Sequence, residues 1–287
     1  MFKQETEIGV KRLERMLERV AEQVLVEKLP LQAEYSWSQL PIPFADRKSQ
    51  NFLPVSRGDE WGQAWESAWF HLQGRVPEQW RGGTVVAQLD FSGEGLVFRP
   101  DGKILQGISN GSVFKWDFNR DLVRLYRNCD GSEEVDLWVE TAANALFGIF
   151  TNPDPPRDDP DRHGTFTATV REMNLCLFDE EQWQLWLDLR LLSGMLKRLP
   201  DTGVRYARIV RSVNDAINSY ATTGGSARAS RELLSAVLAG AGPPPPPQGP
   251  GGGGPPPQRL PAVSGPWSKH GKSPALFPPP GGLRTPP

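Results

Sequence analysis

Cysteine and histidine are scarce in this chain, which narrows the chemistry that its side chains can support. The 287 residues include two cysteines and three histidines. Cys129 and Cys176 lie far apart in sequence and form no C-x-x-C pair, which argues against a metal knuckle or a disulfide scaffold. We interpret both as free thiols in a reducing compartment.

An excess of charge of one sign and a long hydrophobic run are missing as well. The chain has 32 Lys and Arg residues against 34 Asp and Glu residues, so no concentrated positive field exists to attract nucleic acid or an anionic membrane. No apolar run approaches the roughly 18 residues of a membrane span, and the charged N-terminal residues lack the apolar core of a signal peptide. We therefore expect a soluble, cytoplasmic protein with no nucleic-acid or membrane partner.

Proline is rare before Gly242 and abundant after it. Of the 28 prolines, 17 lie in residues 243–287. That segment has no hydrophobic periodicity and too few apolar residues to offset the entropy of ordering it. We predict a disordered tail over residues 243–287 and a boundary near Gly242.

The rest of the chain falls into three segments. Residues 1–30 place apolar side chains at spacings of three and four between charged ones, and the helix that this predicts, over about residues 5–28, is followed by Pro30. Residues 31–178 contain short runs rich in Val, Phe and Trp between turn residues, including a hairpin around residues 99–102. Such strands need a second sheet to cover them, which predicts a β-sandwich or jelly roll.

Residues 179–242 return to a helical period. The start at Asp179 resembles a capping box, and helices are predicted over about residues 179–199, 203–220 and 226–239. The first of them is apolar on more than one face, because a stripe through Trp183, Trp186, Leu187 and Leu191 is supplemented by further leucines on the other side. We expect such a helix to need a larger neighbour, and we interpret the segment as a connector to a further domain.

Several motifs in the first 240 residues occur in the order and spacing of one known family. They are Ala68–Trp69–Phe70, residues 76–82, residues 93–98, Asp101–Gly102, Gln106–Gly107–Ile108, residues 137–140, residues 144–148, residues 173–178 and residues 186–192. In combination they resemble the N-terminal region of glycoside hydrolase family 38 α-mannosidases of the cytosolic type. The resemblance implies a galactose-binding-like jelly roll preceded by one helix and followed by a short helical segment.

The resemblance also implies the activity of a retaining exo-α-mannosidase. In the family an Asp nucleophile acts beside a divalent metal, usually zinc, which a His-x-Asp string at the start of the catalytic domain helps to bind. This sequence contains no His-x-Asp string. The three histidines, His71, His163 and His270, have no spacing that brings them together. We therefore assign no catalytic, cofactor-binding or metal-binding residue and no cofactor to this chain, and we expect a catalytic domain to be absent through truncation or through a frameshift near codon 242.

The tryptophans and the acidic residues admit alternative interpretations. Indole faces on a sandwich can stack on sugar rings, but Trp61, Trp65, Trp69, Trp80 and Trp138 lie on or beside the predicted strands, and we interpret most of them as core residues. The four aspartates of residues 152–161 lack the Gly and Glu of a regular calcium loop and predict a solvated loop. Glu133 and Glu134 are expected in an exposed turn, and Glu94 is interpreted as structural because flanking glycines permit close strand approach.

These considerations leave one main functional hypothesis and two others. The chain is interpreted as an inactive N-terminal part of an α-mannosidase lineage. An active glycosidase would require metal-dependent hydrolysis of an aryl α-mannoside by the chain itself. The other alternative is a non-catalytic carbohydrate-binding or oligomerisation module, for which mannose-containing glycans or a second copy of the chain would be the partners.

Overall fold

The computed structural model of the chain describes residues 3–109, 119–144 and 167–239. The chain separates into two units between Gly242 and Pro243, and all the described residues belong to the first unit. The predicted tail over residues 243–287, the acidic loop over residues 152–161, His163 and His270 lie outside the described residues. Within the described part, no helix is both long and apolar enough to cross a membrane.

The N-terminal helix α1 (Lys3–Val24) is amphipathic, as its spacing predicts. Its buried side chains recur every three or four residues at Leu13, Met16, Val20 and Val24. The prediction that the helix extends to about residue 28 is wrong, because strand β1 (Leu25–Pro30) follows Val24 directly and pairs antiparallel with β12 (Glu172–Phe178). Backbone pairing with this distant partner overrides the local helical pattern.

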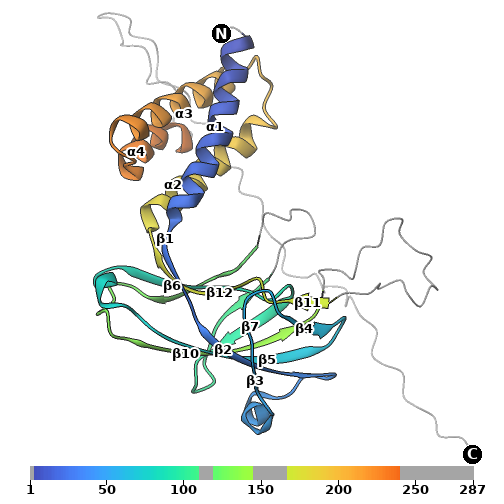
Figure 1. Cartoon of the computed structure of the whole chain (residues 1–287). Coiled ribbons are helices and arrows are strands. Elements are labelled where there is room, and N and C mark those ends of the chain that lie inside the picture. The colour runs from blue at the N-terminus through green and yellow to red at the C-terminus, as the bar shows by residue number, and fades with distance from the viewer. Residues whose placement is uncertain (1–2, 110–118, 145–166, 240–287) are drawn as a thin grey trace, which may run out of the picture. The chain divides into compact units, whose positions relative to one another are not determined.

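Two antiparallel sheets form the jelly roll (Figure 1). One has the order β1-β12-β6-β9, with β6 at Thr84–Asp90 and β9 at Leu122–Tyr126. The other has the order β3-β2-β5-β10-β7-β8. Its strands are β3 (Leu53–Pro54), β2 (Gln32–Ser38), β5 (Ser67–Arg75), β10 (Glu134–Ala142), β7 (Glu94–Phe98) and β8 (Ile104–Ile108). A short pair joins β4 (Glu60–Gln63) to β11 (Thr167–Thr169).

The core lies between the two larger sheets, and alternation along each strand decides which side chains enter it. In β5, Phe70 and Leu72 point into the core, whereas Trp69 packs in a smaller cluster with Trp138 and Phe98 on the opposite face. The 3₁₀ segment Phe44–Ser49 contributes to that outer cluster through Phe44. The predicted hairpin is confirmed, since β7 pairs with β8 and Gly102 in the intervening turn has a φ of +87°.

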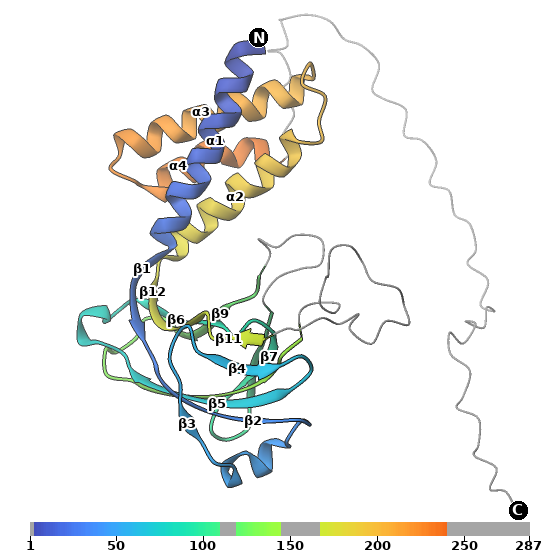
Figure 2. The same ribbon diagram turned by 45° about the vertical axis from the view of Figure 1, so that its right-hand side comes forward.

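The helices that follow the sandwich are α2 (Glu180–Leu196), α3 (Val204–Thr222) and α4 (Ala227–Leu238). Asp179 caps α2 as predicted, because its side chain accepts a hydrogen bond from the Gln182 backbone N–H at 2.9 Å. All three pack with α1 around a second core that includes Leu185, Leu189, Ile209 and Leu234. Figure 2 shows α1 lying alongside α2, so the N-terminal helix supplies part of the cover that α2 needs.

Two adjacent strands connect the sandwich to the helices. Strand β1 continues from α1, and strand β12 runs on into α2. The Asp179 backbone N–H donates to the Val24 carbonyl at 2.9 Å, which ties the two crossings together where the helices begin. At this junction a small cluster of buried side chains joins the two connecting segments to the sheet surface. Its members are Val24, Val86, Cys176 and Phe178. The junction forms part of one wall of a cleft between α2 and the sandwich.

Candidate functional site

Most of the residues singled out in the sequence turn out to be structural. Trp61, Trp69, Trp80 and Trp138 are buried, as expected for core residues. Trp65 is the exception among the five: its side chain is 54% exposed, and it lies in the turn between β4 and β5 with a φ of +71°. Because a turn residue of that conformation lies off the strand alternation, proximity to a strand was no guide to its burial.

Glu94 lies at a point of very close strand approach. A Cβ at Gly93 would overlap the Ala142 carbonyl oxygen, and one at Gly95 would lie 2.9 Å from the Glu140 carbonyl oxygen. The Glu94 carboxylate accepts a hydrogen bond from the Asn144 amide at 2.8 Å. The glycines are thus required for space, and the carboxylate fastens the end of β7.

The Glu133 carboxylate organises its own turn. It accepts hydrogen bonds from the backbone N–H groups of Asp130, Gly131 and Ser132 at 2.6, 3.0 and 3.1 Å. These backbone hydrogen bonds lower the pKa of Glu133. Glu134, by contrast, is exposed on β10 and lies 3.5 Å from Arg75.

His71 lies on the outer face of the six-stranded sheet. Its ring stacks on Trp138 with centroids 4.1 Å apart, and its nitrogens contact Glu34 at 3.0 Å and Asp136 at 3.1 Å. Nowhere in the described residues do three His, Cys, Asp or Glu side chains gather closely enough to hold a metal ion. The described residues therefore do not fit the zinc site that the family resemblance implies.

Both cysteines are free and buried, in agreement with the prediction of free thiols. Burial raises the pKa of Cys176 to about 12. The Cys129 thiol donates to the Trp80 carbonyl oxygen at 2.9 Å inside the sandwich. Neither cysteine has the exposure of a reactive thiol.

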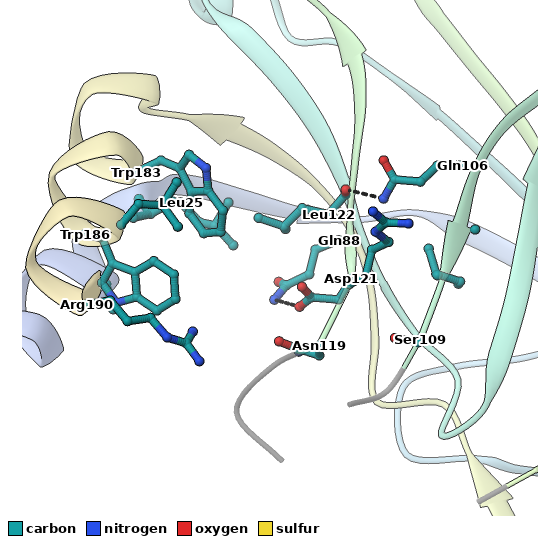
Figure 3. Close-up of a pocket in the computed structure, with 16 residues that line it drawn as sticks. Leu25, Gln88, Gln106, Ser109, Asn119, Asp121, Leu122, Trp183, Trp186 and Arg190 are labelled. Carbon is teal, nitrogen blue, oxygen red and sulfur yellow. Dashed lines mark hydrogen bonds between the residues drawn. The ribbon is translucent and has the colours of Figure 1, made fainter. Parts of the chain in front are cut away.

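A cleft of about 850 Å³ lies where helix α2 faces the sandwich. Figure 3 shows its two walls. Trp183, Trp186 and Arg190 form the helix wall, with the two indole rings stacked at 5.1 Å and Arg190 over the Trp186 ring at 4.7 Å. The opposite wall carries Leu122 and a group of polar side chains from β6, β8 and the start of β9, which comprises Gln88, Gln106, Asn119 and Asp121.

Hydrogen bonds order the polar wall. Lys28 donates to the Gln88 side-chain oxygen at 3.0 Å, and the Gln88 amide donates to Asp121 at 3.4 Å. Burial raises the pKa of Asp121, while the hydrogen bond from Gln88 acts in the opposite direction. Gln106 donates to the Leu122 carbonyl at 2.9 Å and thereby joins the edge strands β8 and β9. The wall combines a half-buried carboxylate with side-chain amides.

Sequence reasoning did not identify this cleft. Trp183, Trp186 and Leu187 were recognised as a helical stripe, but they were not assigned to a binding surface. The side chains of α2 that are buried completely are Leu185, Leu189 and Leu192, on the other side of the helix. Asp121 and Gln88 gave no local signal, since each is a single polar residue in or beside a strand. Only the packing of α2 against the sandwich brings the two sets together.

Two antiparallel sheets packed around a single core define the sandwich as a jelly roll, here joined to a small helical layer. A family model for the jelly roll domain of α-mannosidases of the Ams1-like type matches residues 29–173, which is half of the chain. The chain therefore belongs to that family, and the resemblance inferred from its motifs is confirmed.

Two curated relatives show the extent of the similarity. Alpha-mannosidase 2C1 of Mus musculus is 28% identical over 178 residues, which cover 62% of this chain and 16% of the relative. Alpha-mannosidase G of Dictyostelium discoideum is 27% identical over 177 residues, with the same two coverages of 62% and 16%. The match thus spans about a sixth of the length of these relatives.

A solved β-glucuronidase of Faecalibacterium prausnitzii also matches 55% of this chain and 32% of its own. Its TM-score of 0.33 and identity of 11% are too low to support a comparison of sites.

Proposed function

We propose that this chain supplies the N-terminal, non-catalytic part of a glycoside hydrolase family 38 α-mannosidase of the cytosolic type. The family match over residues 29–173 carries the proposal, because it identifies the jelly roll as one domain of an α-mannosidase. The relatives extend far beyond the matched region, which leaves room in them for a separate catalytic domain. In this proposal the sandwich and helices are a folded platform, and hydrolysis of terminal α-mannosyl residues belongs to another part of the enzyme.

The purified 287-residue chain should therefore not hydrolyse an aryl α-mannoside, with or without added zinc. The mouse relative assayed under the same conditions serves as the positive control. Turnover by the chain that a chelator abolishes and zinc restores would overturn the proposal and establish the chain as a glycosidase in its own right.

The composition break at Gly242 supports a second element of the proposal, namely that the reading frame shifts near codon 242. Out-of-frame translation of GC-rich DNA yields mostly Pro, Gly, Arg and Ala. The other two frames downstream of that codon should then encode a His-x-Asp string followed by aromatic residues. If neither frame encodes one, the frameshift is excluded.

A cytoplasmic location is proposed because the chain matches the α-mannosidase family. Fractionation of cells that express the tagged chain tests this location.

An oligomerisation module is the second candidate. The observation that favours it is a pair of exposed leucines on α2, Leu191 at 58% and Leu187, at the rim of the cleft, at 37%. Burial of these leucines against a second copy would stabilise a dimer. Light scattering coupled to gel filtration tests whether the chain forms a dimer. A stable dimer that Leu191→Glu dissociates supports the oligomerisation module, and a monomer at all concentrations excludes it.

A further inference from the structure

The cleft between α2 and the sandwich has two walls of different chemistry. The helix wall presents the stacked indoles of Trp183 and Trp186 together with the Arg190 guanidinium. The strand wall presents Asp121, Gln88 and Asn119 (Figure 3). A volume of about 850 Å³ lies within the roughly 300–1,000 Å³ typical of sites for small molecules.

The polar wall restricts which ligands could be bound. An entirely apolar molecule would cover Asp121 and Gln88 without replacing their contacts to water, which is costly. The charged side chains of the lining are of both signs, Asp121 against Arg120 and Arg190, so no ligand charge of one sign complements all of them. A neutral molecule with several hydroxyl groups can pair with the polar side chains and brings no charge of its own into the cleft.

Hydroxyl groups also match the hydrogen-bonding capacity that the wall has to offer. A hydroxyl both donates and accepts, so it can pair with a carboxylate and a side-chain amide at once. The hydrogen bond from Gln88 to Asp121 is long at 3.4 Å, which leaves acceptor capacity on the carboxylate. The facing indole and leucine side chains favour a ligand that also has an apolar face, as the C–H face of a pyranose ring does.

We propose that this cleft binds a neutral pyranose sugar, with its hydroxyl groups at Asp121 and Gln88 and its apolar face toward the edge of the Trp186 indole and toward Leu122. No hydrolysis is involved, because the cleft would act as a docking site for a sugar unit. Mannose is the first probe, and that choice alone rests on the proposed function. The chemistry of the cleft requires only a neutral pyranose.

Nuclear magnetic resonance of the ¹⁵N-labelled full chain tests the site through its indole N–H signals. Mannose should shift the Trp183 and Trp186 signals along one saturable curve with a dissociation constant in the millimolar range. The buried indoles of Trp61 and Trp80 are internal controls, since their N–H groups donate to the Phe91 carbonyl and to Glu27 within the sandwich. Sorbitol, which has hydroxyl groups but no ring, and glucuronate, which is anionic, should bind at least about tenfold more weakly.

Two variants locate the site. Trp186→Ala and Asp121→Asn should each weaken mannose binding by about tenfold, which corresponds to the loss of roughly 1.4 kcal/mol of contact. Trp37→Ala is the matched control, because Trp37 is half exposed on β2, outside the residues that line the cleft, and should leave binding unchanged. Circular dichroism verifies that each variant is folded, and Asp121→Asn serves alone if Trp186→Ala is not.

The possible results separate this inference from the proposed function. Saturable shifts at the cleft with mannose, glucose or galactose support a pyranose site. The absence of cleft shifts with all three sugars, or shifts that survive Asp121→Asn unchanged, overturns it. Turnover of an aryl α-mannoside, in contrast, would overturn the non-catalytic role and leave the sugar site standing.

Discussion

Among the described glycines, Gly93 has the least room for a side chain. A Cβ there would overlap the Ala142 carbonyl oxygen of the adjacent strand. We expect Gly93→Ala to lower the free energy of unfolding by about 1–3 kcal/mol, since β7 would have to move away from β10. Urea denaturation measures the change.

Gly194 provides the matched control for that experiment. It lies in α2, and a Cβ there would meet no atom within 4 Å. Gly194→Ala should raise stability by up to about 1 kcal/mol through helix propensity alone. Equal effects of the two substitutions would show that strand spacing does not depend on Gly93.

Asp121 is expected to lower stability at neutral pH. Burial raises the pKa of Asp121 in the folded state, so the folded state binds this proton more tightly than the unfolded state does. Stability therefore falls as pH rises from about 3.9, the pKa of an unfolded Asp, to the pKa in the folded state. Asp121→Asn should therefore be more stable than the parent at pH 7 and equally stable at pH 3. Thermal denaturation across this range decides it, and a variant less stable at pH 7 would contradict the argument.

The cysteine thiols should be silent in the folded chain. Cys176 is fully buried with a pKa of about 12, and Cys129 is buried as well. A thiol reagent at pH 8 should label neither until urea unfolds the protein, after which both should react. Rapid labelling in buffer alone would show that the junction beside Cys176 opens readily.

Single residues were predicted unevenly from the sequence. Trp69 and Trp80 were recognised as core residues because each lies within a clear local pattern. Trp65 was grouped with them but is exposed, because its turn is defined by backbone dihedrals that the sequence pattern does not express. Asp121 could not be distinguished from other exposed aspartates, since its environment is created by Gln88 and by a helix far along the chain.

At the scale of elements, helix α2 separates prediction from outcome most clearly. Its cap at Asp179 was predicted correctly, because capping depends on residues three apart. The sequence did not decide which face would be buried, since leucines lie on both faces. The buried face of α2 is determined in part by α1, which packs on it although the two helices lie far apart in the sequence. Strand β1 shows the same limitation, because only pairing with β12 distinguishes it from a last helical turn.

The two faces of α2 can be compared by parallel substitutions. Leu189→Ala should cost about 2–5 kcal/mol, because the side chain is fully buried in the helical core. Leu191→Ala, two positions away and 58% exposed, should change stability by less than about 0.5 kcal/mol. Chemical denaturation measures both free energies.

The exposed residue Leu191 also allows a test by dye binding. If the exposed leucines of α2 form a contact surface, Leu191→Gln should reduce the binding of a hydrophobic dye by the folded chain. Unchanged dye binding would show that these leucines are not accessible to such ligands.

For the whole molecule, residues 1–242 should be sufficient for the fold. The chain separates into two units at Gly242, and both cores lie before that point. A chain ending at Gly242 should melt within about one degree of the full chain and retain its sugar-induced shifts. A large drop in melting temperature would show that residues 243–287 contribute to stability.

Removal of α1 is the counterpart of that experiment. Without residues 1–24, the buried faces of α2 and α3 would lose Leu13, Met16 and Val20. We expect the shortened chain to aggregate or to bind hydrophobic dye strongly, because the apolar faces of α2 and α3 would be exposed to water.

The paired crossings of β1 and β12 have a mechanical consequence. A single linker would let the helical layer rotate freely, whereas two adjacent strands hydrogen-bonded to each other from Leu25 to Pro30 behave as a two-point hinge that resists twisting. The hydrogen bond from the Asp179 backbone N–H to the Val24 carbonyl holds the two connecting segments together where the helices begin. Cutting the backbone at one crossing would therefore leave the molecule in one piece, held by the other strand and by the shared core beside it.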